Sequence, residues 1–382
     1  MNLNEKIKQE LTPKKAQVKR KANGFIKHDY LVPAGPYQEQ WDWDAFFIGM
    51  SLASEIPSEA IYLKNWAMNY LEHTKKDGYT PGLLTPKGID NRLKHVKPFL
   101  AQGSYFAARF LNDYSWLLPY WPNLKKSVKY RHYKYFDKKT GLSCWYNSME
   151  SGADNNIASL NYPIGSVVSA DLNAFLYREY KALSLIASKL SLKKDQIIFK
   201  KKSEDMKKAI LKYLWSNEDK IFYNIDLKTG EFIKRASYSS LIPLWANIAS
   251  RKQGREMIKK YVINSKKFWA KHGVRTLSAD DKEYNQANII KPYSNWQGPV
   301  WPIVNYLSMH SLLNYGFKKE TEILAEKISN ICLNDIKKTG GMHENYHAET
   351  GKPLAAPDFI SWNLLVGQMI DQSESGYNPF AL

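Results

Sequence analysis

Carboxylic acids alternate with tryptophans near the N-terminus, in an order that suits the binding of a sugar. Asp42 and Asp44 interleave with Trp41 and Trp43. A tryptophan face can stack on the C–H face of a sugar ring, while a neighbouring carboxylate accepts hydrogen bonds from the hydroxyl groups. We therefore predict a monosaccharide-binding site in residues 36–47. The same pattern also fits an aromatic helix start that the two aspartates merely cap.

Asp154 is a second candidate acid, and small residues surround it. Gly152 and Ala153 precede it, and Asn155 and Asn156 follow it. An acid with such small neighbours can lie at the rim of a pocket and still leave room for a substrate. Asp and Asn are also common in loops and as helix N-caps, so these residues alone leave a structural role open.

Two tryptophans flank a Gly-Pro turn in the C-terminal third of the chain. Trp296 and Gln297 precede Gly298-Pro299, and Trp301 follows. A rigid turn can hold stacking surfaces at a fixed orientation, so that little conformational entropy is lost when a ligand binds. Trp301 fits equally well as a core residue at the entry to a helix.

The segment His343-Glu344-Asn345-Tyr346-His347 matches the H-E-x-x-H pattern of zinc peptidases. That site needs both histidines on one face of a regular helix, with the glutamate polarising the metal-bound water. Glycines precede the segment and a Thr-Gly pair follows it, which leaves too little room for a long helix. We therefore interpret Glu344 as a loop carboxylate that activates water as a general base. A zinc peptidase using His343 and His347 is an alternative.

Amphipathic helices are expected to position these segments. Apolar residues recur at three- and four-residue steps, which is the period of one helix face. The stretches are 60–78, with Ser58 as a possible cap and Gly78 near the end, then 172–190, 199–214 and 302–316.

Short loops that contain turns separate the helices. An aromatic residue followed by Thr-Gly recurs at 135–141, 223–230 and 346–351, and the final Gly suits a turn with positive φ. Strand-like alternation is otherwise sparse. Helix pairs joined by short β-hairpin-like loops, without a flexible linker, predict an all-α toroid. A helical bundle or solenoid also fits the pattern.

Bulk composition limits the classes of protein. The 382 residues carry a formal charge of +18, which is scattered over amphipathic helices and forms no recognised nucleic-acid module. Cys144 and Cys332 stand in no metal-ligand or disulfide framework. No run of about 18 apolar residues occurs, and the N-terminus has no signal-peptide pattern. We expect a cytoplasmic protein that binds neither membranes nor nucleic acid, with a basic segment at 1–25 and one domain at 26–382.

Together, the motifs resemble glycoside hydrolase family 63 and its bacterial relatives, including mannosylglycerate and glucosylglycerate hydrolases, and more distantly family 37 trehalases. The likeness extends over residues 36–365 and keeps the order of the family's motifs. They are Trp41-Asp42-Trp43-Asp44-Ala45-Phe46-Phe47, Pro98-Phe99-Leu100-Ala101-Gln102, Glu150-Ser151-Gly152-Ala153-Asp154-Asn155, Asp171-Leu172-Asn173-Ala174-Phe175-Leu176, Gly273-Val274-Arg275-Thr276-Leu277-Ser278, Trp296-Gln297-Gly298-Pro299-Val300-Trp301, Glu344-Asn345-Tyr346 with Thr350-Gly351, and Phe359-Ile360-Ser361-Trp362.

The resemblance implies an (α/α)6 barrel, in which twelve helices form two concentric rings and the active site lies at one mouth. It also implies roles for two acids. Asp154, in the Glu-Ser-Gly-x-Asp motif, corresponds to the general acid, and Glu344 corresponds to the general base. The residues expected to bind substrate are Tyr37, Trp41, Trp43, Asp44, Gln102, Glu150, Asn155, Trp296, Gln297, Trp301, His343 and Trp362.

Three departures from the family bear on substrate specificity. Gln297 stands where several relatives have Arg, and Asn155-Asn156-Ile157 replaces a frequent Asn-Ser-Pro. The interval from Asp154 to Glu344 is shorter than usual for these enzymes, which implies trimmed loops or a missing lid.

The expected reaction is inverting hydrolysis of an α-linked glucosyl or mannosyl residue from a small glycoside or oligosaccharide, without a metal or organic cofactor. Asp154 is expected to hold its proton near neutral pH through a raised pKa, while Glu344 is ionised. A trehalase is an alternative. A catalytically silent sugar-binding protein is another, and it predicts binding without turnover. The sequence indicates no oligomeric state.

Overall fold

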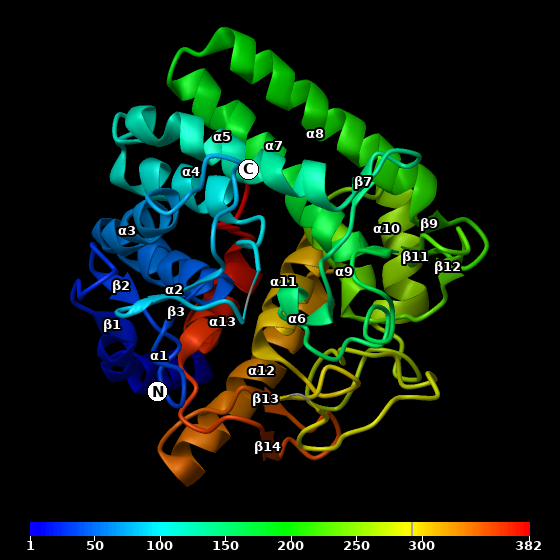
Figure 1. Cartoon of the computed structure of the whole chain (residues 1–382). Coiled ribbons are helices and arrows are strands. Elements are labelled where there is room, and N and C mark those ends of the chain that lie inside the picture. The colour runs from blue at the N-terminus through cyan, green and yellow to red at the C-terminus, as the bar shows by residue number, and fades with distance from the viewer. Residues whose placement is uncertain (93, 292) are drawn as a thin grey trace.

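The computed structural model describes residues 1–92, 94–291 and 293–382, and helices dominate it (Figure 1). The helices are α1 (Leu3–Leu11), α2 (Asp42–Glu55), α3 (Ala60–Leu71), α4 (Leu100–Leu111), α5 (Leu117–Lys134), α6 (Ser148–Ser151), α7 (Ala170–Lys189), α8 (Lys193–Tyr213), α9 (Tyr238–Trp245), α10 (Arg251–Met257), α11 (Pro302–Asn314), α12 (Lys318–Thr339) and α13 (Val366–Ser375). The strands are two or three residues long: β1 (Lys19–Arg20), β2 (Tyr30–Leu31), β3 (Gln40–Trp41), β4 (Leu83–Thr85), β5 (Gly88–Ile89), β6 (Phe136–Asp137), β7 (Leu142–Ser143), β8 (Val167–Val168), β9 (Trp215–Ser216), β10 (Ile221–Phe222), β11 (Asn224–Asp226), β12 (Phe232–Ile233), β13 (Asn345–Tyr346) and β14 (Pro353–Leu354).

The helices form two concentric layers, and the predicted (α/α)6 barrel is confirmed. Within the described residues the inner ring consists of α2, α4, α7, α9, α11 and α13, each packed on the next. The short helix η4 (Ser361–Leu365) leads into α13 and packs against α2, which closes the ring. Outer helices pack on the inner ones as antiparallel neighbours, as with α3 on α2 and α8 on α7 (Figure 1). The N-terminal helix α1 packs against α12 and α13 and buries Ile7 and Leu11.

The two layers differ in sequence as their burial requires. The inner helix α2 is buried at every position from Asp42 to Ala53, so it carries no polar face. In the outer helix α8 only Phe199, Ser203, Met206 and Ile210 are buried, and its lysines cover the remaining surface. Among the described residues, no helix is both long and apolar enough to cross a lipid bilayer.

Most of the predicted helices form where the periodicity places them, as α3, α7, α8 and α11. The exception is the end of α3, which stops at Leu71 and not near Gly78. Gly78 has φ +95° and belongs to a separate turn, in which its N–H donates to the carbonyl of Lys75. Ser58 lies in a 3-10 turn (Pro57–Glu59) before α3 and does not cap it.

The three Thr-Gly segments form β-hairpins, as predicted. They join β6 to β7, β11 to β12, and β13 to β14, and each pair is antiparallel. Gly141, Gly230 and Gly351 have φ values between +70° and +75°, so the turns use the left-handed region that glycine adopts without strain.

Candidate active site

A pocket with a volume of about 200 Å³ opens where the inner helices begin. Trp43 and Asp44 reach it from the first turn of α2, Trp301 from the residue before α11, and Trp362 from η4 before α13. The pocket brings together the two predicted catalytic acids and seven of the predicted binding residues, namely Asp154, Glu344, Tyr37, Trp41, Trp43, Asp44, Trp296, Trp301 and Trp362. The remaining lining residues are Pro33, Arg92, Lys97, Met149, Gly152, Tyr293, Ser294 and Phe359.

Four tryptophans form the aromatic wall of the pocket. The rings of Trp296 and Trp301 stack with their centroids 3.9 Å apart. Trp43 lies edge-on to Trp362 at 5.4 Å and tilted to Trp296 at 6.2 Å. Trp301 donates its indole N–H to the carbonyl of Asn295, which fixes the ring. Because neighbouring rings hold one another, the wall is rigid before any ligand binds.

Two residues that we expected to bind substrate support this wall from behind. Asn155 Oδ1 accepts the backbone N–H of Trp296 at 2.7 Å, and its Nδ2 donates to the carbonyl of Ser294. Gln297 Nε2 donates to the carbonyl of Asn155 at 2.9 Å. These bonds tie the acid loop to the Gly-Pro turn, and neither side chain lines the pocket.

Asp154 lies in a loop that follows α6, and the local backbone explains its small neighbours. Gly152 has φ +81°, and a Cβ atom there would stand 2.7 Å from Trp43. Glycine is therefore required both by the backbone conformation and by the close approach of the indole. Burial raises the pKa of Asp154 to about 7, although the charge of Lys97 and a hydrogen bond with Ser294 oppose the rise. The direction agrees with the raised pKa that we predicted for this acid.

Glu344 enters the pocket from the residue before β13 and is 8% exposed. Burial raises its pKa well above the usual value, and the charges of Asp154 and Asp44 raise it further. We expected Glu344 to be ionised, but burial and the neighbouring carboxylates disfavour its charged form. The pKa of Tyr37 is also raised, by burial and then by Glu344, Asp44 and Asp154, so the three carboxyl groups face one tyrosine.

Asp335, on the outer helix α12, fixes the segment that carries Glu344. Its Oδ2 accepts the backbone N–H of His343 at 2.9 Å and the hydroxyl of Tyr346 at 2.9 Å. The Nδ1 atom of His343 also lies 2.9 Å from Oδ2. A single buried carboxylate thus holds the residue before Glu344 and the residue two positions after it. His343, predicted to bind substrate, contacts this carboxylate and does not line the pocket.

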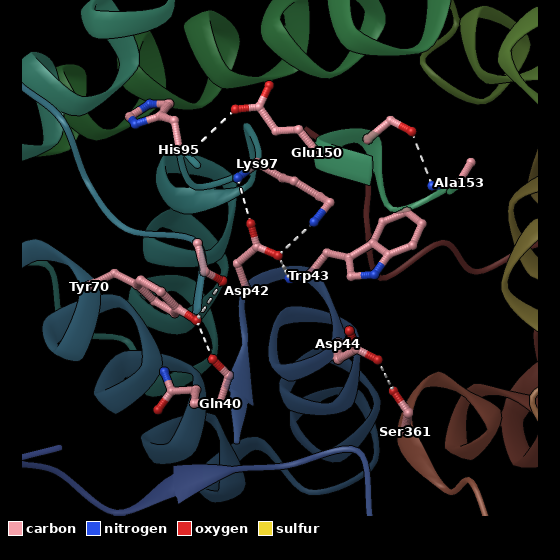
Figure 2. A network of polar contacts seen from close by, with 12 residues as sticks. Gln40, Asp42, Trp43, Asp44, Tyr70, His95, Lys97, Glu150, Ala153 and Ser361 are labelled. Carbon is pink, nitrogen blue, oxygen red and sulfur yellow. Dashed lines mark hydrogen bonds and ion pairs between the residues drawn. The ribbon is translucent and has the colours of Figure 1, made fainter. Parts of the chain in front are cut away.

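Asp44 is the third carboxyl group of the pocket. It is 5% exposed, and burial raises its pKa to about 7 against a hydrogen bond from Ser361 and the charge of Lys97. The Ser361 hydroxyl donates to Asp44 Oδ1 at 2.8 Å, which joins the start of α2 to η4 (Figure 2). Asp44 therefore spans the point where the inner ring closes.

Gln102 and Glu150 lie outside the pocket, although we predicted that both would contact substrate. Gln102 Nε2 donates to the carbonyl of Pro98, and its Oε1 accepts from Arg178. Glu150 forms a buried ion pair with Arg131 at 2.7 Å. Both side chains are used within the protein core, where unpaired polar groups would be costly.

Lys97 and Arg92 line the pocket and were not predicted from the sequence. Lys97 is buried and pairs with Asp42, whereas Arg92 is half-exposed and lies over the Trp41 ring at 5.1 Å. The only sequence signal for Lys97 is that a lysine directly precedes Pro98 and an apolar stretch. Among 55 basic residues that signal does not stand out.

The H-E-x-x-H segment does not have the conformation that a zinc peptidase needs. Residues 343–347 form a loop and strand β13, so His343 and His347 share no helix face. His347 Nδ1 instead accepts the backbone N–H groups of Glu349 and Thr350. No group of three His, Cys, Asp or Glu side chains arranged to hold a metal occurs among the described residues. The zinc-peptidase alternative is wrong on this geometry.

Comparison with known proteins places this pocket in a family. A mannosylglycerate hydrolase from Rubrobacter radiotolerans is 26% identical over 190 residues, a match that spans 50% of this chain and only 40% of that relative. The crystal structure of a GH63 mannosylglycerate hydrolase from Thermus thermophilus in complex with glucose shares the fold. Its TM-score is 0.72 at 19% identity, over 94% of this chain and 99% of that one.

Neutral trehalase from Saccharomyces cerevisiae has the same fold with a TM-score of 0.69 at 15% identity, over 92% of this chain and 76% of that one. A family model matches residues 37–362 of the sequence. This range includes every residue of the pocket except Pro33. The chain therefore belongs to the family of mannosylglycerate hydrolase MGH1-like glycoside hydrolase domains.

Proposed function

We propose that this protein hydrolyses an α-glycosidic bond with inversion, using Asp154 as general acid and Glu344 as general base. The observation that carries the proposal is that both carboxyl groups line one pocket whose wall is made of tryptophans. Asp154 gives its proton to the glycosidic oxygen as the bond to the anomeric carbon breaks. Glu344 removes a proton from the water that attacks the opposite face of that carbon. This geometry needs carboxyl groups roughly 6.5 to 9.5 Å apart, so that the water fits between them.

The protonation states follow from the coupling of the carboxyl groups. A pKa of about 7 lets Asp154 carry a proton at neutral pH, as a general acid must. The charge of Asp154 is one of the causes that raise the pKa of Glu344. When Asp154 is protonated, that repulsion is absent and Glu344 ionises more readily. The carboxyl groups therefore titrate as a coupled unit, and the reaction needs the state in which Asp154 holds the proton and Glu344 is ionised.

For the substrate we propose a small glycoside of glucose or mannose that carries an acidic aglycone such as glycerate. Arg92 and Lys97 place cations at the pocket. Lys97 is paired with Asp42, so the half-exposed Arg92, which also bonds Asp90 and Glu39, is the one that would favour a carboxylate in the leaving group. The names of the relatives agree, since two of them are mannosylglycerate hydrolases. Trehalose is the second candidate because the fold is shared with a trehalase, but it offers no anion to these cations.

The test is a screen of purified protein with mannosylglycerate, glucosylglycerate, trehalose, kojibiose, nigerose and maltose, followed by NMR of the first anomer released. We expect cleavage of a glycerate glycoside and release of the inverted anomer. Asp154→Asn should reduce kcat by about 10²- to 10⁴-fold. Glu349→Gln is the matched control, because Glu349 is half-exposed, pairs with Arg275 and does not line the pocket. The retained anomer, or near-normal turnover by Asp154→Asn, would contradict the proposal.

A further inference from the structure

Lys97 is held at both ends by one aspartate at the edge of the pocket. Its backbone N–H donates to Asp42 Oδ2 at 2.7 Å, and its ammonium group donates to Asp42 Oδ1 at 2.9 Å (Figure 2). The backbone N–H of Trp43 also donates to Asp42 Oδ1, at 2.7 Å. The Lys97 side chain is 2% exposed, so this is a buried ion pair. Such a pair is strongly oriented by its hydrogen bonds.

The same lysine packs against the loop that carries Asp154. Its ammonium nitrogen lies 5.4 Å from the centre of the Trp43 ring. A Cβ atom at Gly152 would stand 3.0 Å from Lys97 Cε and 2.7 Å from Trp43. Lys97 and Trp43 therefore meet at Gly152, two residues before Asp154. The lysine thus joins the start of α2 to the Asp154 loop.

The charges around Lys97 make it a cation set among acids. Its ion-pair partner is Asp42. Groups on its pocket side are Asp44, Asp154, Glu344 and the half-exposed Arg92, and groups behind it are His95, Arg131, Glu150 and Glu179. The charged groups behind Lys97 have hydrogen-bond or ion-pair partners among themselves or in the backbone. Arg131 pairs with Glu150, and Glu179 accepts the N–H groups of Ala101 and Gln102. His95 is buried and its pKa is lowered, so it adds no charge near neutral pH. Apart from its partner Asp42, the positive charge of Lys97 therefore acts on the pocket acids Asp154 and Asp44.

We propose that Lys97 is a positioning residue that locks the Asp154 loop against α2 and supplies the positive charge that balances the carboxyl groups of the pocket. The role in catalysis rests on the function proposed for Asp154, whereas the electrostatic role does not. The charge of Lys97 opposes the effect of burial at both Asp154 and Asp44. Without it, both acids would hold their protons to higher pH.

The test is an NMR titration of protein labelled with ¹³C at the aspartate carboxyl carbons, with the Asp154 signal assigned through Asp154→Asn. In Lys97→Met the titration midpoint of Asp154 should rise by about one pH unit or more, because a nearby cation stabilises the ionised form. The matched control is Lys125→Met. Lys125 pairs with Asp195 at 2.7 Å and lies 5.5 Å from the Trp121 ring, but it is outside the pocket. An unchanged Asp154 midpoint in folded Lys97→Met would overturn the proposal.

A second variant covers the case in which Lys97→Met does not fold. The single change leaves Asp42 buried without its partner, which is strongly destabilising. Asp42→Asn combined with Lys97→Met removes both charges, and the Asp154 midpoint should still lie above that of the wild type. A midpoint equal to the wild-type value in this double variant would also reject the electrostatic role.

Activity separates this proposal from the function on which it partly rests. The titration needs no substrate, so it stands even if no α-glycoside is cleaved. If a substrate is cleaved, the alkaline limb of the pH profile of kcat/KM should shift to higher pH in Lys97→Met, by the same amount as the titration midpoint of Asp154. A lower rate with an unmoved alkaline limb would show that Lys97 serves packing alone.

Discussion

The mouth of the barrel and its interior beyond the pocket are both lined with aromatic side chains. In the part of the chain that the structure describes, those at the mouth surround a pocket of about 200 Å³, whereas those in the interior pack closely. Deeper in the ring, the Phe380 side chain fills the axis at 0% exposure. Its ring centroid lies within about 6 Å of Phe46, Phe47, Phe106 and Tyr306, from three inner helices. Around the pocket, similar aromatic residues surround three carboxyl groups instead. The comparison shows one scaffold with a filled region that stabilises and an open region that is available for chemistry.

The hydrogen-bond partners of several polar groups also differ between the two regions. Beyond the pocket, the Phe380 carbonyl accepts from Arg178, and Gln372 Oε1 accepts from Tyr306. In the pocket, Asp154 and Glu344 have raised pKa values because burial is not offset by ion pairs of their own. Groups kept in unfavourable surroundings at a site reduce stability, and such positions are typical of function.

Glu344→Gln gives the largest expected effect, and it separates activity from stability. We expect kcat to fall by about 10²- to 10⁴-fold, because the base is lost. Stability above pH 7 should be unchanged or higher, because a buried carboxyl group that repels Asp154 and Asp44 is removed. Thermal unfolding and steady-state kinetics of the same preparation measure both. A lower melting temperature of Glu344→Gln would contradict the view that the pocket acids serve activity and not stability.

Phe380→Ala should have the converse effect. Removal of a fully buried phenylalanine costs about 3–5 kcal/mol of unfolding free energy, through lost burial and a residual cavity. Urea unfolding measures this loss, and kcat/KM of the folded fraction should stay near the wild-type value. Tyr377→Ala is the control, because Tyr377 is 51% exposed and should change stability by less than about 0.5 kcal/mol. A loss of activity as large as that of Glu344→Gln would show that the two regions are not separable.

Asp335→Asn tests whether the pocket depends on the outer layer. The amide can accept from His343 or Tyr346 but carries no charge, so the segment around Glu344 should be held less firmly. We expect kcat to fall by about tenfold with little change in KM, since a small misplacement of a catalytic group lowers the rate. Asp335→Ala should have a larger effect, and equal activity of both variants and the wild type would exclude this role.

At any one pH, the change expected in the last test is a gradual one, a pH dependence of stability. Asp44 and Asp154 have folded-state pKa values of about 7, above the usual value of 3.8. Between about pH 4 and 7 the unfolded chain has released these protons and the folded chain retains them, so the stability that they contribute falls as pH rises. The slope is at most about 1.4 kcal/mol per pH unit for each group. Asp154→Asn should reduce the slope measured by denaturant titrations across that range, and an unaltered slope would contradict the raised pKa.

The sequence predicts most of the helices well because burial sets their apolar periodicity, whereas the (α/α)6 barrel was implied by the family resemblance. It predicts the pocket less completely, as the alternating acids at the start of α2 show. Successive residues of a helix are rotated by about 100°, so Asp42 and Asp44 point in nearly opposite directions. Asp44 reaches the pocket, whereas Asp42 turns back to Lys97 (Figure 2).

The predicted binding residues that lie outside the pocket do so for a common physical reason. Glu150 and Gln102 are polar residues within motifs, but their partners Arg131 and Arg178 come from other parts of the chain. Only the packed fold decides whether such a group faces a substrate or another side chain. Lys97 was missed for the same reason, because nothing in its local sequence indicates that Asp42 and Gly152 lie beside it.

The position of α1 has a consequence for how the molecule is made. This first helix packs on α12 and α13, and its residues Asn4 and Lys8 both bond to Asp371 of α13. During synthesis α1 emerges long before its partners exist, and the inner ring lacks its closing helix until α13 follows. Contacts between such distant segments form late and slowly in folding. The growing chain therefore keeps the apolar face of α1 uncovered until α12 and α13 have been made, and a chaperone that covers this face should raise the yield of folded protein.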